Sequence, residues 1–372
     1  MKRFPWVLLL LIIIATSGCG VVGEMAPAGE ELKAEKRISV APSPTPVRGE
    51  PEDVLLGMYP TFLLQRTMHE FERFDRWIEP TGKKLSIAAT FLDFEDPDIK
   101  RRVPAEMQAA WKAGYVPFVN LSAGNIETSW TAKEIADGEL DPQIRTWARA
   151  YARWARAGQR RAFIAPLQEM NGYWVTYGGD PEHFKQAYAR IQDIFREEGV
   201  PSDSVSWVFS PNGWSDEGHE FERYYPGDSA VDVVGFNSFN FGTCSSWPKW
   251  ETYDDIYAPY LVRLRNMAPD KPIFISSMGT VAEGGDRGQW LLDTYRQMVD
   301  VPNLRAILYF NRWETRESLP GCPDQADYRI FNSENEEGVD GFTEAISAPE
   351  FKYYPPGSPA MGELMFGTRL RR

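Results

Sequence analysis

The hydrophobic positions of the chain fall into short runs that are separated by longer stretches of mixed polarity. Each run is hydrophobic almost throughout, which is typical of parallel strands that are covered on both faces. We predict eight such strands of five to eight residues, at Val54–Tyr59, Leu85–Leu92, Tyr115–Leu121, Ala162–Leu167, Val205–Phe209, Val231–Phe236, Pro272–Ser276 and Leu304–Phe310.

Helical patterns occupy the stretches between these runs. Trp147, Tyr151 and Trp154 are spaced by four and three residues, which places them on one face of a helix over 144–157. A helix over 181–198 follows Gly-Gly-Asp and begins with proline, as many helices do. Two more helices are expected over 69–78 and 340–348. Alternating strands and helices predict one α/β domain, a (β/α)8 TIM barrel over residues 53–350.

A doubly wound open sheet is the alternative to the barrel. The first predicted strand continues as Leu56-Gly-Met-Tyr-Pro60, with no glycine-rich phosphate loop after it. This absence argues against a dinucleotide fold, and no cofactor is expected.

The N-terminus has the features of an export signal. Lys2 and Arg3 precede an apolar run that is too short to span a bilayer comfortably, and small residues lead to Cys19. Residues 1–18 therefore resemble a bacterial lipoprotein signal with Cys19 as the lipidated residue, although Thr16 stands where an aliphatic residue is usual. An ordinary cleaved signal peptide is the alternative. Either signal predicts an exported protein, which is a cell-membrane lipoprotein or a periplasmic or extracellular protein.

Proline, glutamate, alanine and lysine dominate the segment that follows, residues 19–52. Such a composition cannot bury a core, so we expect a disordered tether between the membrane and the barrel. The last residues, 351–372, are expected to form a C-terminal tail. In an oxidising compartment Cys244 and Cys322 could form a disulfide, and free thiols are the alternative.

The composition excludes some classes of binding partner and favours others. The net charge is −13, so the chain lacks the excess of lysine and arginine that nucleic-acid binding requires. Three cysteines and three histidines are scattered along the sequence, which argues against a metal site. Aromatic residues make up 13% of the chain, including 13 tryptophans, and rings of this kind can stack on sugar faces. We expect a monomer that contacts a membrane only through its lipid anchor.

Candidate chemistry lies where the predicted strands end, because active sites of barrels form there. The fourth strand ends in Gln168-Glu-Met-Asn-Gly-Tyr-Trp174. Glu169 could donate a proton to a glycosidic oxygen, Asn171 could bind a hydroxyl group, and Trp174 could stack on a sugar ring. Alternatively, Glu169 pairs with an arginine and Trp174 packs in a loop.

Glu-Met-Asn-Gly-x-Trp after a strand resembles the acid/base motif of glycoside hydrolase family 26, whose members include β-mannanases, mixed-linkage β-glucanases and β-1,3-xylanases. The similarity extends over residues 53–315, through stretches such as Ile135-Ala-Asp-Gly-Glu-Leu-Asp141 and Val205-Ser-Trp-Val-Phe-Ser-Pro-Asn212. It implies Glu169 as the acid/base. Polysaccharide or oligosaccharide contacts are expected at Gln168, Asn171, Trp174, Asn212, Trp214, Asn237 and Trp313, with Trp247 nearby.

The chain departs from the family pattern at three strand ends. Gln168 replaces the usual histidine, and Phe236-Asn-Ser-Phe239 replaces a stretch with an acidic residue and a tyrosine. The seventh strand ends in Ser276-Ser-Met-Gly279, which places Ser277 where the family carries its nucleophilic glutamate. Retaining hydrolysis needs two carboxyl groups, so Ser277 cannot support the standard mechanism.

Three functional hypotheses remain open. The first is a β-mannanase-like glycosidase with weakened or altered chemistry, in which Glu283, Asp286 or Glu314 supplies the second carboxylate. The second is a non-catalytic, polysaccharide-binding pseudoenzyme of the cell envelope. The third is an envelope scaffold that uses the barrel only as a rigid body.

Overall fold

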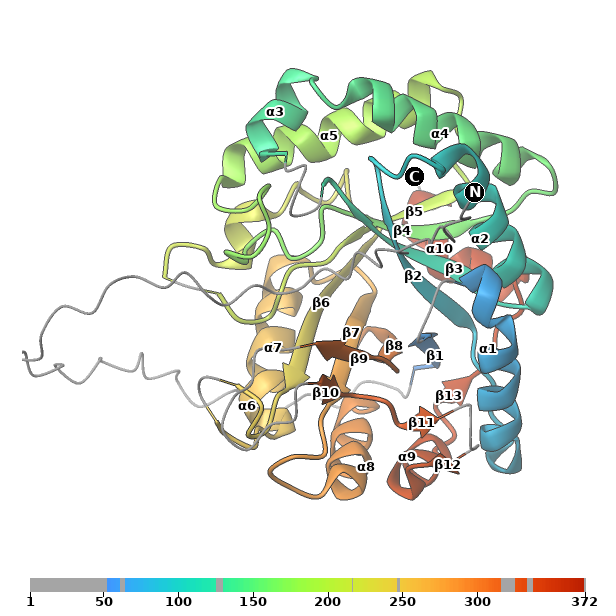
Figure 1. The fold of residues 1–372 in the computed structure, drawn as a ribbon, viewed down its shortest axis with the longest axis vertical. Helices are drawn as coiled ribbons and strands as arrows, with labels where there is room; N and C mark the ends of the chain where they lie inside the picture. The colour runs from blue at the N-terminus through green and yellow to red at the C-terminus, as the bar shows by residue number, and fades with distance from the viewer. Residues whose placement is uncertain are drawn as a thin grey trace, which may run out of the picture.

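The computed structural model describes residues 52–60, 64–124, 130–215, 217–245, 248–315, 325–332 and 337–370. Eight parallel strands form one sheet in chain order, and pairing of the first strand with the eighth closes it into a barrel (Figure 1). The barrel strands are β1 Val54–Tyr59, β2 Ile87–Asp93, β3 Val116–Ser122, β4 Ala162–Pro166, β5 Val205–Phe209, β6 Val233–Asn240, β7 Ile273–Thr280 and β8 Leu304–Phe310. The predicted (β/α)8 barrel and its eight strands are therefore confirmed.

Two strands extend beyond their predicted ends. Strands β6 and β7 each continue for four residues past the end of the hydrophobic run, to Asn240 and Thr280. The added residues are largely polar or small, so the hydrophobic pattern alone could not include them. Asn237 and Ser277 thus lie within strands rather than in loops.

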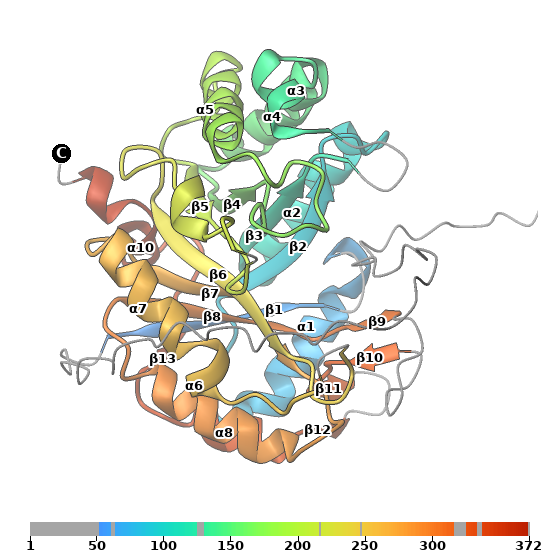
Figure 2. The same cartoon turned by 90° about the vertical axis from the view of Figure 1, so that its left-hand side faces the viewer.

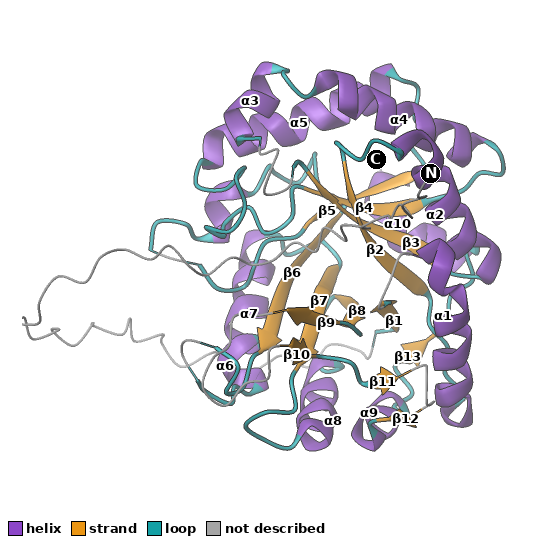
Figure 3. Cartoon of the chain, viewed as in Figure 1, coloured by secondary structure: helices purple, strands orange, loops and turns teal. Residues whose placement is uncertain are grey.

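Helices cover the outside of the barrel (Figure 3). The four predicted helices are confirmed as α1, α4, α5 and α9, and Asp180 caps α5 by accepting a hydrogen bond from the His183 amide. Between β5 and β6 the described chain forms only a short 3₁₀ helix, so the expected strand–helix alternation is incomplete there. The helices are α1 Leu64–Ile78, η1 Glu79–Thr81, α2 Ile99–Ala113, α3 Ala132–Asp137, α4 Asp141–Arg156, α5 Pro181–Glu197, η2 Phe221–Tyr224, α6 Tyr253–Ile256, α7 Ala258–Met267, α8 Arg287–Met298, α9 Asp340–Ile346 and α10 Pro359–Leu370.

Two apolar cores hold the fold together. The outer core lies between the helices and the sheet and includes the predicted stripe of Trp147, Tyr151 and Trp154, all of them buried. The inner core fills the barrel with side chains such as Phe118 and Phe163. The barrel interior is therefore packed with apolar side chains towards the ends at which the strands begin, and the polar groups of the candidate site lie at the opposite ends.

The expected C-terminal tail contains two elements, the short strand β13 (Phe351–Lys352) and the helix α10. Strand β13 adds to β1. Helix α10 contributes Met361, Leu364, Met365 and Phe366 to the inner core, and the Ser206 hydroxyl donates a hydrogen bond to the Met365 carbonyl at 3.0 Å. Helix α10 therefore closes the end of the barrel at which the strands begin (Figure 2).

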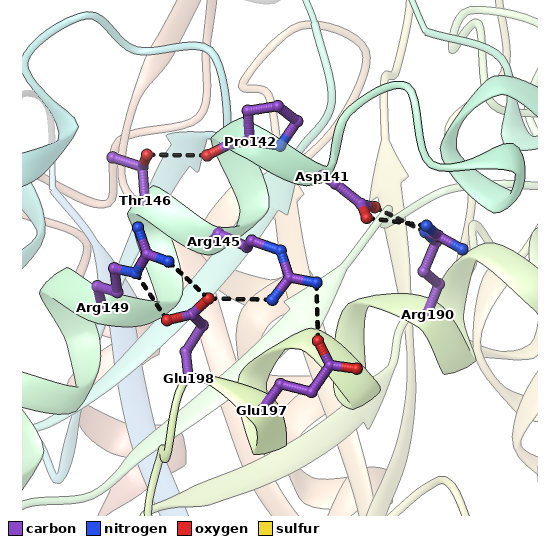
Figure 4. A network of polar contacts seen from close by, with 8 residues as sticks. All are labelled: Asp141, Pro142, Arg145, Thr146, Arg149, Arg190, Glu197 and Glu198. Carbon is purple, nitrogen blue, oxygen red and sulfur yellow. Dashed lines mark hydrogen bonds and ion pairs between the residues drawn. The ribbon is translucent and has the colours of Figure 1, made fainter.

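A network of ion pairs links α4 to the C-terminal end of α5 (Figure 4). Glu198 accepts hydrogen bonds from Arg149 at 2.6 Å and from Arg145 at 3.0 Å, and Arg145 also binds Glu197. Arg190 binds both carboxylate oxygens of Asp141, at the start of α4. The two guanidinium groups around Glu198 lower the pKa of its carboxyl group.

Glu198→Gln is expected to lower Tm at neutral pH by about 1–3 °C, because exposed ion pairs contribute little each. A carboxyl group with a lowered pKa stabilises the fold above the pKa of its unfolded state, and this contribution is lost as the pH falls through the folded-state value. The Tm difference between variant and wild type should therefore shrink on acidification. Glu182→Gln, which removes a highly exposed pair with Lys185, serves as the control and should change Tm less.

The N-terminal signal, Cys19 and the tether lie outside the described residues, apart from Glu52 at the end of the tether. Within the part of the chain that the structure describes, no helix has the length and apolar character that a membrane span requires.

Candidate active site

Glu169 lies just beyond the end of β4, and both oxygens of its carboxylate accept hydrogen bonds. Asn237 Nδ2, on β6, donates to Oε1 at 2.9 Å, and Trp174 Nε1 donates to Oε2 at 2.8 Å. The predicted Glu169, Trp174 and Asn237 are thus brought together. We call the surrounding group the strand-end site, which comprises Tyr59, Asn120, Glu169, Trp174, Asn237, Ser277 and Arg312.

The backbone that carries Glu169 is strained. Leu167 and Glu169 have φ values of 54° and 59°, which side-chain-bearing residues rarely adopt. Neighbouring strands hold this conformation, since the Leu167 amide donates to the Leu121 carbonyl and the Glu169 amide to the Ser210 carbonyl. Such strain persists only where the surroundings impose it and is frequent at functional sites.

Gln168 faces β3 and is buried. Its Nε2 donates to the Ser122 hydroxyl at 2.9 Å, and its backbone carbonyl accepts a hydrogen bond from the Tyr177 hydroxyl. In the structure Gln168 thus supports the loop that carries Glu169. A contact between Gln168 and a substrate stays a prediction.

Asn171 and Asn212 organise the loop after β5. Asn171 Nδ2 donates to the Asn212 carbonyl, and the Asn212 amide donates back to Asn171 Oδ1, both at 2.9 Å. Asn212 Oδ1 then accepts a hydrogen bond from the Trp214 amide. These bonds fix Trp214 next to the strand-end site, while the contribution of the two asparagines to substrate binding stays a prediction.

Two large aromatic side chains near Glu169 are exposed. Trp214 is 49% exposed and Tyr173 is 64% exposed, and the structure shows no other exposed large hydrophobic residue in the described chain. Tyr173 contacts Trp174 edge to face, with ring centroids 5.1 Å apart. Tyr173 belongs to the Gln168–Trp174 motif, and its position beside Trp174 is the signal in the sequence that points to it.

Ser277 lies on β7 opposite Asn237 of β6, in a region where both strands are irregular. The pairing register shifts between Phe236 and Asn237, and the β7–β8 register shifts between Ile275 and Met278. Bulges of this kind redirect side chains at active sites. Because Asn237 also binds Glu169, it is a neighbour of both the predicted acid/base and Ser277. The Ser277 hydroxyl is buried and has no hydrogen-bond partner.

Tyr59, which the sequence analysis did not identify, occupies the centre of the site. Its hydroxyl donates to the Ser276 carbonyl on β7 and accepts a hydrogen bond from Asn120 Nδ2 on β3, both at 2.7 Å. Burial raises the pKa of Tyr59, and the nearby Glu169 carboxylate raises it further. Tyr59 is therefore a neutral hydroxyl that joins opposite sides of the barrel.

Asp93, at the end of β2, was also not predicted. Burial raises the pKa of its carboxyl group to about 6, although backbone amides of Glu95 and Gly124 donate to its two oxygens and oppose the shift. These bonds give Asp93 a role in shaping the loops after β2 and β3.

The three acids considered as replacement carboxylates lie in different settings. Asp286 caps α8 by accepting the Gln289 amide and lines a hollow of about 540 Å³ against α6 and α8, outside the barrel. Glu314 is on the short strand β9 (Trp313–Thr315), where it pairs with Ala326 of β10 (Gln325–Asp327). Glu283 lies in the loop after β7. No hydrogen bond that we find joins any of them to Glu169 or Ser277.

The remaining predicted residues are only partly described. Trp313 is partly buried and pairs with Asp327, whereas Trp247 lies outside the described residues. Cys244 is buried and disulfide-bonded. Cys322 lies outside the described residues, so its pairing with Cys244 stays a prediction. Among the described side chains, no group of three His, Cys, Asp or Glu residues is placed to hold a metal ion.

Comparison with known proteins supports the fold. The model of glycosyl hydrolase family 26 matches residues 152–283, a span that contains both Glu169 and Ser277. The resemblance to family 26 is confirmed. Over 268 residues the chain is 25% identical to endoglucanase H of Acetivibrio thermocellus, covering 68% of this chain and 28% of that protein. It is 28% identical over 161 residues to mannan endo-1,4-beta-mannosidase of Bacillus subtilis, covering 36% of this chain and 42% of that protein.

The chain thus spans less than half the length of these two curated relatives. Solved structures agree on the barrel fold. The Bacillus subtilis mannanase BCman superposes with a TM-score of 0.53 at 20% identity, covering 83% of this chain and 89% of that structure. A β-mannanase from a symbiotic protist of the termite Reticulitermes speratus, complexed with gluco-manno-oligosaccharide, gives a TM-score of 0.54 at 17% identity, covering 85% and 90%. At these identities the structures establish the fold alone.

Proposed function

We propose that the protein binds a β-linked polysaccharide at the strand-end site and does not cleave it by the retaining mechanism of family 26. The substrate class follows from the relatives, whose names describe a glucanase and mannan-cleaving enzymes. In this proposal the protein has the fold of an endo-β-glycanase but is a pseudoenzyme, which binds the polysaccharide without hydrolysing it.

The exposed aromatic rings of Tyr173 and Trp214 carry the binding proposal. Exposed rings next to polar groups suit a ligand with both apolar faces and hydroxyl groups, which is the chemistry of a sugar. The rings stand on loops that are fixed by hydrogen bonds, so little order has to be gained on binding.

Serine at position 277 argues against retaining hydrolysis. That mechanism requires two carboxyl groups about 5–5.5 Å apart, one of which attacks the anomeric carbon. A neutral hydroxyl cannot stabilise the developing positive charge as a carboxylate does, and no hydrogen bond from a described base activates the Ser277 hydroxyl.

Binding is tested by titrating the protein with β-mannan, mixed-linkage β-glucan and β-1,3-xylan oligosaccharides in a calorimeter. We expect saturable binding to at least one of them, and a Kd about tenfold or more weaker in the Tyr173→Ala/Trp214→Ala double variant. Trp130→Phe is the matched control, since it changes a partly buried aromatic side chain and should leave Kd unchanged. Absence of binding to every glycan, in protein with a normal Tm, would favour the scaffold hypothesis instead.

Weak hydrolysis is a second candidate, supported by the buried hydroxyls of Ser276 and Ser277, neither of which has a partner. Polar atoms of this kind can hold a water molecule. An inverting reaction needs one carboxylate to activate that water and a second carboxyl group to protonate the leaving oxygen, so this candidate requires Glu283, Asp286 or Glu314 beside Glu169. Release of reducing ends that disappears in Glu169→Gln would support this candidate. The same rate in wild type and Glu169→Gln would reject it.

We further propose that the protein is exported and anchored through a lipid on Cys19, which keeps the barrel at the cell envelope. Metabolic labelling with a radioactive fatty acid should mark the wild-type chain and not Cys19→Ser. Labelling of both chains would place the lipid elsewhere, and labelling of neither would support an ordinary signal peptide.

A further inference from the structure

The strand-end site also holds a cation, Arg312, which the sequence analysis did not identify. Arg312 follows β8 by two residues, and its guanidinium lies over the rings of Phe91 and Phe310 at 5.8 and 5.7 Å. The aromatic rings stabilise a flat cation in this position without using its N–H groups. The orientation of Arg312 is thus set by β2 and β8 together.

The N–H donors of Arg312 face no hydrogen-bond acceptor among the residues that the structure describes. A guanidinium has five N–H donors, and in the described part of the chain none of the hydrogen bonds or ion pairs that we find involves them. Glu314 and Glu70 lie within its electrostatic field, but neither forms an ion pair with it. Burial lowers the pKa of Arg312, and these two carboxylates oppose the shift.

Arg312 and Glu169 lie on opposite sides of the barrel opening. Glu169 follows β4 and Arg312 follows β8, which are opposite strands of the eight-stranded barrel. The Tyr59 hydroxyl experiences the fields of both groups and hydrogen-bonds to β3 and β7. Arg312 therefore faces the same central space as Glu169.

The carboxylate of Glu169 and the guanidinium of Arg312 differ in the hydrogen bonds that they already make. Trp174 and Asn237 already donate to both oxygens of Glu169, whereas no residue in the described ranges accepts a hydrogen bond from the Arg312 side chain. A carboxylate at position 277 would supply negative charge to this space, but Ser277 is neutral. The unmet interaction of the site is therefore that of a cation, and an anionic group on the ligand would satisfy it.

We propose that Arg312 binds the carboxylate of a uronic acid, so that the glycan recognised by this barrel is acidic. The inference rests on the proposed function and specifies its ligand. A guanidinium matches a carboxylate with two parallel hydrogen bonds, a pairing that is stronger than a bond to a neutral hydroxyl. The C6 carboxylate of a uronic acid is attached to the ring itself, so a single sugar residue can bind Arg312 and stack on an aromatic ring.

Two oligosaccharides with the same backbone test the inference. β-1,4-Linked mannohexaose and its C6-oxidised counterpart, hexa-β-1,4-mannuronate, differ only in the carboxylates. We would measure Kd of the full chain, solubilised in mild detergent, for both ligands by calorimetry at low and at physiological salt. The variants are Arg312→Gln, Arg312→Lys and, as the control, Arg153→Gln on the exposed face of α4, with Tm recorded for each.

The Kd of the wild type should be at least about tenfold lower for the mannuronate than for the neutral hexaose, as expected for a charge-assisted hydrogen bond. Arg312→Gln should remove this preference, so that the two ligands bind this variant with the same Kd. Arg312→Lys should keep part of the preference, and Arg153→Gln all of it. Equal binding of the two ligands to the wild type, or a preference that survives in Arg312→Gln, overturns the acidic-glycan inference while the proposed function stands. No binding of either ligand or of the neutral glycans above overturns both.

Discussion

Ser277→Glu is expected to convert the binding site into a hydrolytic one. The substitution places a carboxylate on β7 opposite Asn237, which binds Glu169, so the two carboxyl groups required for retaining hydrolysis would share one neighbour. A missing nucleophile costs on the order of three or more decades in rate, so the gain should be at least about a thousandfold over any wild-type background. Release of reducing ends from the glycan that the wild type binds measures the effect.

Two controls separate chemistry from other effects of this substitution. Ser277→Gln has nearly the same volume without the charge and should stay inactive. The double variant Ser277→Glu/Glu169→Gln should lose the gained activity, because the acid/base is absent. If Ser277→Glu binds glycan and keeps its Tm but remains inactive, the proposed correspondence between Ser277 and the family nucleophile is wrong.

Phe366→Ala is expected to destabilise the protein by about 3–5 kcal/mol, the usual cost of truncating a buried phenylalanine. Phe366 belongs to α10 and packs in the inner core, where Arg161 also lies over its ring at 5.3 Å. The inner core combines side chains of α10 with side chains of the barrel strands, so the helix and the barrel should unfold together. Urea denaturation followed by circular dichroism gives the change in the free energy of unfolding.

Lys352→Ala, an exposed change on neighbouring β13, is the control and should stay within about 0.5 kcal/mol of wild type. A Phe366→Ala variant as stable as this control would mean that α10 contributes nothing to the closure of the barrel. Glycan binding by folded Phe366→Ala protein should be unchanged, because α10 and Glu169 lie at opposite ends of the strands.

The sequence predicted the fold well because each apolar run forms one strand of the barrel. Each run is buried on both sides, so its hydrophobic character continues without interruption. Strands β6 and β7 were predicted only as far as Phe236 and Ser276, where the hydrophobic run ends and polar residues follow. Their continuation depends on hydrogen bonds with neighbouring strands, and these are not encoded in local hydrophobicity.

The sequence predicted part of the placement of the candidate site residues. Glu169, Trp174 and Asn237 meet as expected, because parallel strands end at the same face of a barrel. Tyr59 could not be assigned, since it belongs to an apolar run and its hydroxyl bonds to Ser276, 217 positions away. Arg312 gives no motif, and its significance depends on the rings on which it lies and on the N–H donors that face no acceptor among the described residues.

The closed floor of the barrel determines how the protein is displayed. The chain enters β1 at Asp53, at the end of the barrel that α10 covers, whereas Glu169 lies at the opposite end. With a lipid at Cys19, the tether would join the barrel at the end that α10 covers. The opposite end, which carries Glu169, would then face away from the membrane. The 34 residues of 19–52 span at most roughly 120 Å when fully extended. The barrel would thus reach up to about this distance from the bilayer, and a polysaccharide bound at the strand-end site would be held there.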